Sequence, residues 1–403
     1  MSSSNHKCDV PYYVRALAMG LPAIMLGMQI SIFIGLIPMV RNGHVDFRNL
    51  YVAGWMLRSG YAQQLYDYGS QKDFQDSLVS REEVALPFIR PAYQALLFAP
   101  FSYLGFRAAY LCFLLFNLGL VGLCFCLMRP RMHWLKCLHP AAPLAIFTFP
   151  PLAVALFQGQ DSIFLLTLLC IAVVALDKHK PMSAGMLVGL GLFKFQIVIP
   201  IAVLFMIWRK WKFLLGFILS ASLLSIASTL LVGTRASAFY VRSLISIGTS
   251  KGLSSGLTLQ VSHMANLHGL IFGLFGTHIS RNLSLCAIAV LSAVVLLLSA
   301  KYRALGGDAL AFAIITSVLV SYYMFIHDLS PLLIPLAFLR GSLTRMALVF
   351  IAPVLMAFAP SFFFLACLPI LGWWLCQRNS SAVRIVDPSN LESNCCWPPT
   401  CQD

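Results

Sequence analysis

A single carboxylate, Asp46, follows the first long apolar run of the chain and lies in the segment RNGHVDFRNLY, residues 41–51. Three basic side chains surround it: Arg41, His44 and Arg48. A carboxylate in this position can act as a general base toward a bound hydroxyl group. A polar residue just beyond a membrane helix is more often solvated surface, so its position alone leaves both interpretations open.

Isolated polar side chains also interrupt later apolar runs, and each has a structural interpretation beside a functional one. The lysine in GLGLFKFQIVIP either extends toward water or binds an anion. The polar residues in FQGQDS and IHDLSP either cap the helices that follow them or face a substrate. Their convergence on one surface would favour a site. The candidate side chains are Arg90, Tyr93, Gln160, Asp161, Lys194, His268, His327 and Asp328.

The composition is that of a membrane protein. Of 403 residues, 59% are hydrophobic and 10% are charged, whereas soluble domains carry about 25% charged residues. The 28 lysines and arginines give a net charge of +14, but they fall mostly in short clusters between apolar runs, as in cytoplasmic loops. We therefore predict an all-α polytopic membrane protein without a nucleic-acid partner.

Motifs for cofactor chemistry are missing. The 12 cysteines lie mostly inside apolar runs and form no CxxC pair, so they behave as small hydrophobic residues. Walker-type glycine loops, HExxH, GxSxG and clusters with metal-ligand spacing are also absent. We expect neither a metal nor another cofactor.

Apolar runs long enough for full or partial membrane spans recur along the chain, and we read about twelve membrane helices. Three stretches interrupt them: 41–90, which mixes acids and bases in amphipathic helices; 91–104, too short to cross; and 233–276, rich in Ser and Gly. The expected spans are residues 16–40, 106–128, 140–157, 160–176, 182–193, 195–208, 213–232, 281–300, 309–326, 330–339, 343–358 and 360–376.

The basic turns predict the orientation. With the N-terminus in the cytoplasm and 91–104 at the outer surface, the turns RPRMHWLK, DKHK, RKWK and KYR all face the cytoplasm. The runs 182–193 and 195–208 then form a hairpin of broken helices with Lys194 at its outer tip. The candidate side chains collect on the same outer face.

This pattern predicts one integral-membrane domain over residues 1–380, with outer loops at 41–105 and 233–280 and a disordered cytoplasmic tail at 381–403. Its outer face combines carboxylates, imidazoles and isolated cations, ringed by apolar helices. Such a surface suits an amphipathic substrate with a lipid tail and an anionic head, in contact with membrane lipids.

Five ordered motifs over about residues 40–340 resemble glycosyltransferase family 87, the polyprenol-phosphate-mannose-dependent mannosyltransferases of GT-C fold. The resemblance departs at Arg90-Pro91-Ala92, where Tyr-Pro-Pro is usual, at Asp161, which replaces Asn, and at His327-Asp328, which replaces a His pair. The motifs are HVDFRNLYVAGWMLRSGYAQQLYD, FIRPAYQALLFAPFSYLGFRAAYLCFLLFNL, FQGQDSIFLL, AGMLVGLGLFKFQIVIP and MFIHDLSPLLIPL.

The resemblance implies an inverting transfer of a sugar, most commonly mannose, from a polyprenyl-phosphate donor to a lipid or glycan acceptor. It implies that Asp46 is the catalytic base, that Lys194 contacts the lipid phosphate and that His327 lies near the active site. The expected place is the periplasmic face of a bacterial inner membrane. Side chains expected to complete donor binding are Arg48, Arg90, Tyr93, Gln160, Asp161, His268 and Asp328.

A lipid-linked sugar flippase or transporter is the alternative function. No internal duplication is visible in the sequence, and intramembrane acids are scarce. A flippase would translocate labelled lipid without making a glycosidic product. A non-catalytic membrane scaffold, the third interpretation, gives no reason for Asp46 and Lys194 to share a face.

Overall fold

The computed structural model describes residues 12–132, 146–246, 264–276, 280–302 and 306–338, together with residues 261 and 278. All regular elements in these ranges are α-helices or short 3-10 helices. The expected spans 343–358 and 360–376 and the tail 381–403 lie outside the described residues. The all-helical prediction is therefore confirmed for the described part of the chain.

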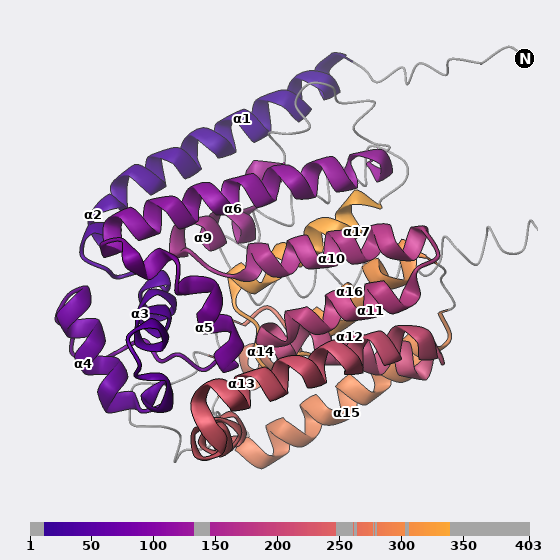
Figure 1. Ribbon diagram of the computed structural model, residues 1–403. Helices are drawn as coiled ribbons and strands as arrows, with labels where there is room; N and C mark the ends of the chain where they lie inside the picture. The colour runs from indigo at the N-terminus through magenta and orange to yellow at the C-terminus, as the bar shows by residue number, and fades with distance from the viewer. Residues whose placement is uncertain are drawn as a thin grey trace, which may run out of the picture.

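The chain begins with a long helix that lies beside α6 along one edge of the molecule (Figure 1). This first helix, α1 (Tyr12–Gly35), is followed by the short helix α2 (Ile37–Arg41). The bounds of α6 (Phe106–Met128) coincide with the predicted run, which starts after Gly105 and ends where the basic turn RPR begins.

Residues 41–105 form a compact group of short helices at one end of the molecule (Figure 1). They are α3 (Phe47–Arg58), α4 (Tyr68–Leu78) and α5 (Ala92–Phe98). Phe47 of α3 is buried and stacks on Phe113 of α6 at 5.1 Å between ring centroids. At Gly54 the helices α3 and α5 approach so closely that a Cβ atom would lie 2.5 Å from the backbone of Phe98. This packing fixes α3, and with it the residue just before it.

The remaining helices form a bundle with one large apolar core. They run roughly alongside one another, with α10 near the centre and α15 at the far edge (Figure 1). The elements are α9 (Pro150–Gln158), α10 (Ser162–Asp177), α11 (Pro181–Leu190), η4 (Gly191–Lys194), α12 (Phe195–Ile207), α13 (Trp211–Ser246), α14 (Leu267–Phe275), α15 (Arg281–Ala300), α16 (Gly307–Val320), η6 (Ile326–Leu332) and α17 (Leu333–Ala337).

Four stretches of the described chain are long and apolar enough to cross a membrane. Shorter apolar helices at Ala23–Gly35, Ser162–Asp177, Gly307–Val320 and Ile326–Ala337 accompany them. This supports a multi-pass membrane protein, while the total of about twelve spans and the GT-C fold stay predictions. The four long stretches are Phe106–Arg131, Pro181–Ile207, Trp211–Leu244 and Asn282–Ala300.

The stretch Pro181–Ile207 reverses direction at η4. Asp177, just before α11, accepts a 2.7 Å hydrogen bond from the backbone of Gly307, and Trp208, just after α12, lies against Phe312 near the start of α16. Both ends of the stretch therefore lie at the same end of the bundle, while Lys194 lies at the other. We call the end that holds Lys194 the site end and the end that holds Asp177 the basic end.

The segment 233–276, predicted as a stretch that does not span the membrane, is partly helical in the described residues. Helix α13 continues to Ser246, well past the predicted limit of 232, after a break at Gly233 with φ 83°. Glycine tolerates this left-handed φ, because it has no Cβ atom. The outer part of α13 turns toward the short helices, where Tyr240 stacks on Tyr66 at 4.9 Å.

Candidate functional site

Asp46 occupies the position before α3, but its carboxylate does not cap the helix. Instead, one carboxylate oxygen accepts a hydrogen bond from Gln160 Nε2. The Asp46 backbone N–H donates to Gln158 Oε1 at 3.1 Å. The side chain is half-buried, so it is held in place and still accessible. Asp46 is thus positioned by residues more than a hundred places later in the sequence.

Gly159 allows its two neighbours to hold Asp46 from both sides. It ends α9 with φ 61°, a left-handed conformation typical of glycine at helix C-termini. A Cβ atom at this position would lie 2.7 Å from Phe47 Cβ. The tight turn therefore brings Gln158 and Gln160 against the start of α3.

A cluster of buried charges adjoins Asp46 through Gln160. Gln160 Oε1 accepts a 3.0 Å hydrogen bond from Arg90, and Arg90 Nε lies 2.7 Å from Asp161. Lys194 Nζ lies 3.0 Å from Asp161 and 2.6 Å from Asp328. Asp161, Lys194 and Asp328 are each at most 3% exposed. One connected network thus runs from Asp46 to Asp328.

The sequence left open whether Lys194 extends toward water or binds an anion, and in the structure its partners are carboxylates of the chain itself. It lies at the predicted helix reversal, but the surrounding helices bury it between two carboxylates. A buried charge requires a partner of opposite sign, and here Asp161 and Asp328 provide it. Lys194 keeps one further hydrogen that these two contacts do not use.

Charges of opposite sign lie side by side in this network. Asp161 is buried against Arg90 and Lys194, which provide two charges of opposite sign. The pKa of Arg90 is raised, because Asp161 outweighs the effect of its burial. Within the described part of the chain, Nη1 of Arg90 has no hydrogen-bond partner. The site therefore presents donor groups from two cations, the buried Lys194 and the partly buried Arg90.

His327 lies at the edge of the same cluster. Its Nε2 is 3.6 Å from Asp328 Oδ1, and its side chain is 14% exposed. Asp328 also accepts hydrogen bonds from Ser162 Oγ at 3.3 Å and from the backbone of Phe325 at 3.3 Å. Asp328 was predicted to cap a helix entered at Ser330, but it lies inside η6: one of its oxygens bonds back to the Phe325 backbone and the other binds Lys194. Asp161 forms no side-chain cap at all.

Three predicted site residues have their partners elsewhere. Arg48 is 2% exposed and donates to Gln75 Oε1 at 3.0 Å and to Ser80 Oγ at 2.8 Å, so it ties α3 to α4. The hydroxyl of Tyr93 donates to the carbonyl of Leu190, which joins α5 to α11. His268 lies 3.0 Å from the carbonyl of Tyr322 through Nδ1. The side chains that the structure gathers are Asp46, Arg90, Gln160, Asp161, Lys194, His327 and Asp328.

The family model of glycosyltransferase family 87 matches residues 88–327, more than half of the chain. The chain belongs to glycosyltransferase family 87. The match includes Arg90, Asp161, Lys194 and His327 and begins after Asp46. No curated protein and no solved structure matches the chain.

For a family 87 glycosyltransferase, two further glutamines are of interest, one in contact with Asp161 and one close to Lys194 in the sequence. Gln94 donates to Asp161, and its Oε1 is buried without a partner among the described residues. Gln196 Oε1, two residues after Lys194, is also buried without a partner there. Free amide oxygens can accept hydrogen bonds from sugar hydroxyls. The signal for Gln94 was an amide inside the apolar segment AYQALLF, a weak one that sequence reasoning passed over.

In the ranges that the structure describes, no three His, Cys, Asp or Glu side chains of this family 87 member form a group that could hold a metal ion. The carboxylates of Asp161 and Asp328 are bridged by the Lys194 ammonium group. The described cluster is therefore arranged around a lysine.

Proposed function

We propose that the protein transfers a sugar, with mannose as the first candidate, from a polyprenyl-phosphate donor to an acceptor hydroxyl, with inversion at the anomeric carbon. The observation that carries the proposal is the accessible Asp46 carboxylate, hydrogen-bonded to Gln160 and joined through it to Arg90 and Lys194. A base and cationic groups side by side suit both halves of such a reaction.

Asp46 acts as the general base. Its carboxylate takes the proton from the acceptor hydroxyl as the oxygen attacks the anomeric carbon. The bond between that carbon and the phosphate oxygen breaks, and the polyprenyl phosphate leaves with the electron pair. Gln160 orients the carboxylate through its hydrogen bond to one oxygen, which leaves the other oxygen for the hydroxyl.

Arg90 and Lys194 stabilise the leaving phosphate. Negative charge grows on it as the glycosidic bond breaks, and donors fixed in a site that excludes water are effective at stabilising such charge. Nη1 of Arg90 and the third hydrogen of Lys194 are the donors in question. Their carboxylate partners keep both cations fixed, because each cation is held from more than one direction.

The buried amide oxygens of Gln94 and Gln196 accept hydrogen bonds from the donor sugar. His327 lies at the same edge and provides a polar wall for the sugar. A site built to hydrogen-bond a particular hydroxyl rejects a sugar that lacks it, because its own polar groups are then left unpaired. Specificity for the donor sugar thus resides in these residues.

The site end faces the periplasm in a bacterial inner membrane. Basic turns in the described chain support this orientation, since Arg131, Lys178, Arg209 and Lys301 all belong to the basic end, opposite Asp46. Positively charged turns typically stay in the cytoplasm. The donor and acceptor then meet at the outer surface.

The test uses purified protein in lipid nanodiscs with labelled polyprenyl-phosphate mannose and a membrane lipid extract. We expect a glycosylated product by mass spectrometry, and loss of at least about 10³-fold in rate for Asp46→Asn, because a positioned base contributes about 10²–10⁴-fold. Asp73→Asn is the matched control, since Asp73 is an exposed carboxylate of the nearby helix α4.

Two outcomes would overturn the proposal. Transfer by Asp46→Asn at the wild-type rate would remove the role of the base. In proteoliposomes, translocation of labelled lipid across the bilayer without any glycosidic product would identify a flippase instead. If the protein transfers arabinose and not mannose from a polyprenyl-phosphate donor, the proposed donor sugar is wrong and the proposed mechanism is unchanged.

A further inference from the structure

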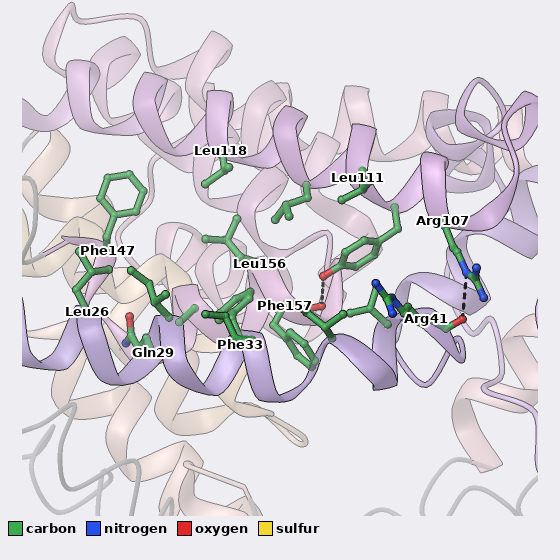
Figure 2. A pocket seen from close by; sticks show the side chains of 17 residues that line it. Leu26, Gln29, Phe33, Arg41, Arg107, Leu111, Leu118, Phe147, Leu156 and Phe157 are labelled. Atoms are coloured by element: carbon green, nitrogen blue, oxygen red, sulfur yellow. Dashed lines mark hydrogen bonds between the residues drawn. The ribbon is translucent and has the colours of Figure 1, made fainter.

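In several places a buried tyrosine hydroxyl bonds the chain itself. Tyr51, Tyr66 and Tyr93 donate to backbone carbonyls at 2.9, 2.9 and 3.2 Å. Tyr110, in the lining of an apolar groove between α1 and α6, donates to the carbonyl of Phe157 at 2.7 Å (Figure 2). A buried tyrosine hydroxyl normally finds such a partner. The hydroxyl groups of these four tyrosines are therefore committed to the fold.

Tyr240 and Tyr323 depart from this pattern. Both side chains are partly buried, and neither hydroxyl has a hydrogen-bond partner among the described residues. Neither oxygen is sealed inside the protein, so each borders space that a ligand can fill. Tyr240 belongs to the outer part of α13, beyond the break at Gly233, and Tyr323 lies between α16 and η6. Two free hydroxyls thus come from separate segments of the site end.

Tyr240 lies near Arg90. Its ring stacks on that of Tyr66, with 4.9 Å between the centroids and 24° between the planes. Tyr66 in turn donates its hydroxyl to the carbonyl of Arg90 at 2.9 Å. The charge of Arg90 interacts electrostatically with the Tyr240 hydroxyl. Beyond the bend at Gly233, α13 therefore brings a tyrosine to the edge of the charged cluster.

Tyr323 lies near the same charges. Its ring centroid is 5.9 Å from that of Phe195, the residue after Lys194. Its hydroxyl interacts electrostatically with Arg90 and with Tyr240. Both hydroxyls therefore accompany Nη1 of Arg90, which likewise has no hydrogen-bond partner in the described chain.

The charges around Lys194 do not attract an anion by their sum. Arg90 and Lys194 are balanced by Asp161 and Asp328, and Asp46 adds a further negative charge. A phosphate at this place must be held by single donor groups that point at its oxygens. A tyrosine hydroxyl suits this role beside carboxylates, since it keeps its proton at neutral pH and adds no charge.

The leaving phosphate has enough acceptor oxygens for these donors. Two of its oxygens bear no carbon in the donor, and a third becomes terminal when the bond to the sugar breaks. Nη1 of Arg90 and one hydrogen of Lys194 occupy only part of this acceptor capacity. A sugar hydroxyl has two acceptor lone pairs, so several converging donors fit a phosphate better.

We propose that the hydroxyls of Tyr240 and Tyr323 donate hydrogen bonds to the leaving phosphate, beside Arg90 and Lys194. The proposal rests on the function proposed above and adds two binding residues to it. Neither tyrosine belongs to the five motifs that resemble family 87. As negative charge grows on the phosphate, both hydrogen bonds strengthen, so the two hydroxyls promote its departure as well as its binding.

The test measures the affinity of the full-length protein in nanodiscs for a polyprenyl phosphate, which is the leaving group itself. Tyr240→Phe and Tyr323→Phe keep each ring and remove only the hydroxyl. We expect Kd to rise about tenfold in each variant and about 100-fold in the double variant, because each hydroxyl loses a hydrogen bond to a charged group. With polyprenyl-phosphate mannose as the donor, kcat for sugar transfer should fall as well.

Two control variants separate phosphate binding from folding. Tyr103→Phe removes the hydroxyl of an exposed tyrosine and should change neither Kd nor Tm. Tyr51→Phe removes a hydrogen bond to the carbonyl of Leu104 and should lower Tm while Kd stays the same. Tyr240→Phe and Tyr323→Phe should leave the Tm of the ligand-free protein unchanged, since their hydroxyls bond nothing in the described chain.

Three results would overturn the proposal. An unchanged Kd in the double variant would exclude contact between the hydroxyls and the phosphate. A raised KM for the mannose donor, with Kd for polyprenyl phosphate unchanged, would assign the hydroxyls to the sugar. A lowered Tm of the ligand-free Phe variants would assign them to the fold.

The same measurements distinguish this proposal from the proposed function. The expected losses of affinity, without sugar transfer by the wild type, would support the phosphate site and refute the glycosyltransferase reaction. Sugar transfer by the wild type, with a phosphate affinity that neither substitution changes, would do the reverse. Absence of polyprenyl phosphate binding by the wild type would refute both.

Discussion

Lys194 donates a 2.6 Å hydrogen bond to Asp328, and both side chains are buried. The pair joins the reversal between α11 and α12 to the start of η6. A second carboxylate, Asp161, lies 3.0 Å from the same ammonium group. Lys194 thus connects three segments that are distant in sequence, and the bundle at the site end depends on its charge.

Replacing Lys194 by methionine should destabilise the protein strongly. The substitution leaves Asp328 buried without its counter-charge, and breaking a buried pair in this way costs about 3–5 kcal/mol. Thermal unfolding in detergent would measure the loss. The double variant Lys194→Met with Asp328→Asn should recover much of it, because the uncompensated charge is removed. A single variant as stable as the wild type would contradict the buried pair.

Gln160 is a positioning residue for Asp46, and Gln160→Leu tests it. The Asp46 carboxylate loses its donor, and a hydrogen bond to a charged group contributes about 1.5–3 kcal/mol. We expect kcat to fall about 10- to 100-fold while KM for the donor changes little. Gln63→Leu, an exposed glutamine in the same outer segment, is the control. A fall confined to KM would instead assign Gln160 to donor binding.

Arg48 should contribute to stability and not to donor binding. Arg48→Met removes hydrogen bonds from a buried guanidinium to Gln75 and Ser80, which should lower the free energy of unfolding by about 2–3 kcal/mol. Residues 59–90 should become more sensitive to limited proteolysis, with KM for the donor unchanged. Arg81→Met is matched, since Arg81 is exposed. If Arg48→Met raises KM for the donor and leaves stability normal, Arg48 contributes to donor binding.

Asp161→Asn should destabilise the protein. The substitution removes a buried carboxylate that contacts both Arg90 and Lys194, and breaking a buried ion pair costs about 3–5 kcal/mol. Thermal unfolding in detergent would measure the loss. Asp73→Asn, which replaces an exposed carboxylate, is the matched control. Equal stability of the two variants would contradict the contacts of Asp161 with these cations.

The sequence predicted the helices whose ends are marked by a change from apolar to polar, glycine or basic residues. Helix α6 and helix α15 (Arg281–Ala300) have the bounds of the predicted runs 106–128 and 281–300, because glycine, serine or basic residues flank uniform apolar stretches. Asp46 and Lys194 were expected on one face, since alternating helix directions bring the ends of successive runs together. The structure places both at the site end.

Side-chain direction was not predictable in the same way. Arg48 and Arg90 both lie in the outer segment among polar residues, yet Arg48 turns into α4 while Arg90 turns toward Asp161. The direction of each arginine side chain depends on which partner the packing of α3, α4 and α5 brings near it. Hydrophobic periodicity in the sequence does not predict that partner. For the same reason the two carboxylate partners of Lys194 could not be derived from its apolar surroundings.

The positions where the chain departs from the family pattern meet in one place. Arg90 contacts Asp161, and Asp161 and Asp328 both contact Lys194. The departures add one positive and two negative side chains around an existing lysine, so the four charges, with Lys194 included, sum to zero. The structure thus joins these positions, which are distant in sequence, into one network.

The turn at Gly159 couples local unfolding of the outer segment to local unfolding at the end of α9. Phe47 packs on the bare backbone of Gly159, and the residues beside it hold Asp46, so the outer segment and the end of α9 share their hydrogen bonds. Segments joined in this way exchange their amide hydrogens as one cooperative unit. Local unfolding of residues 43–48 should therefore expose residues 157–161 at the same time, and the base and its supports are lost or restored together.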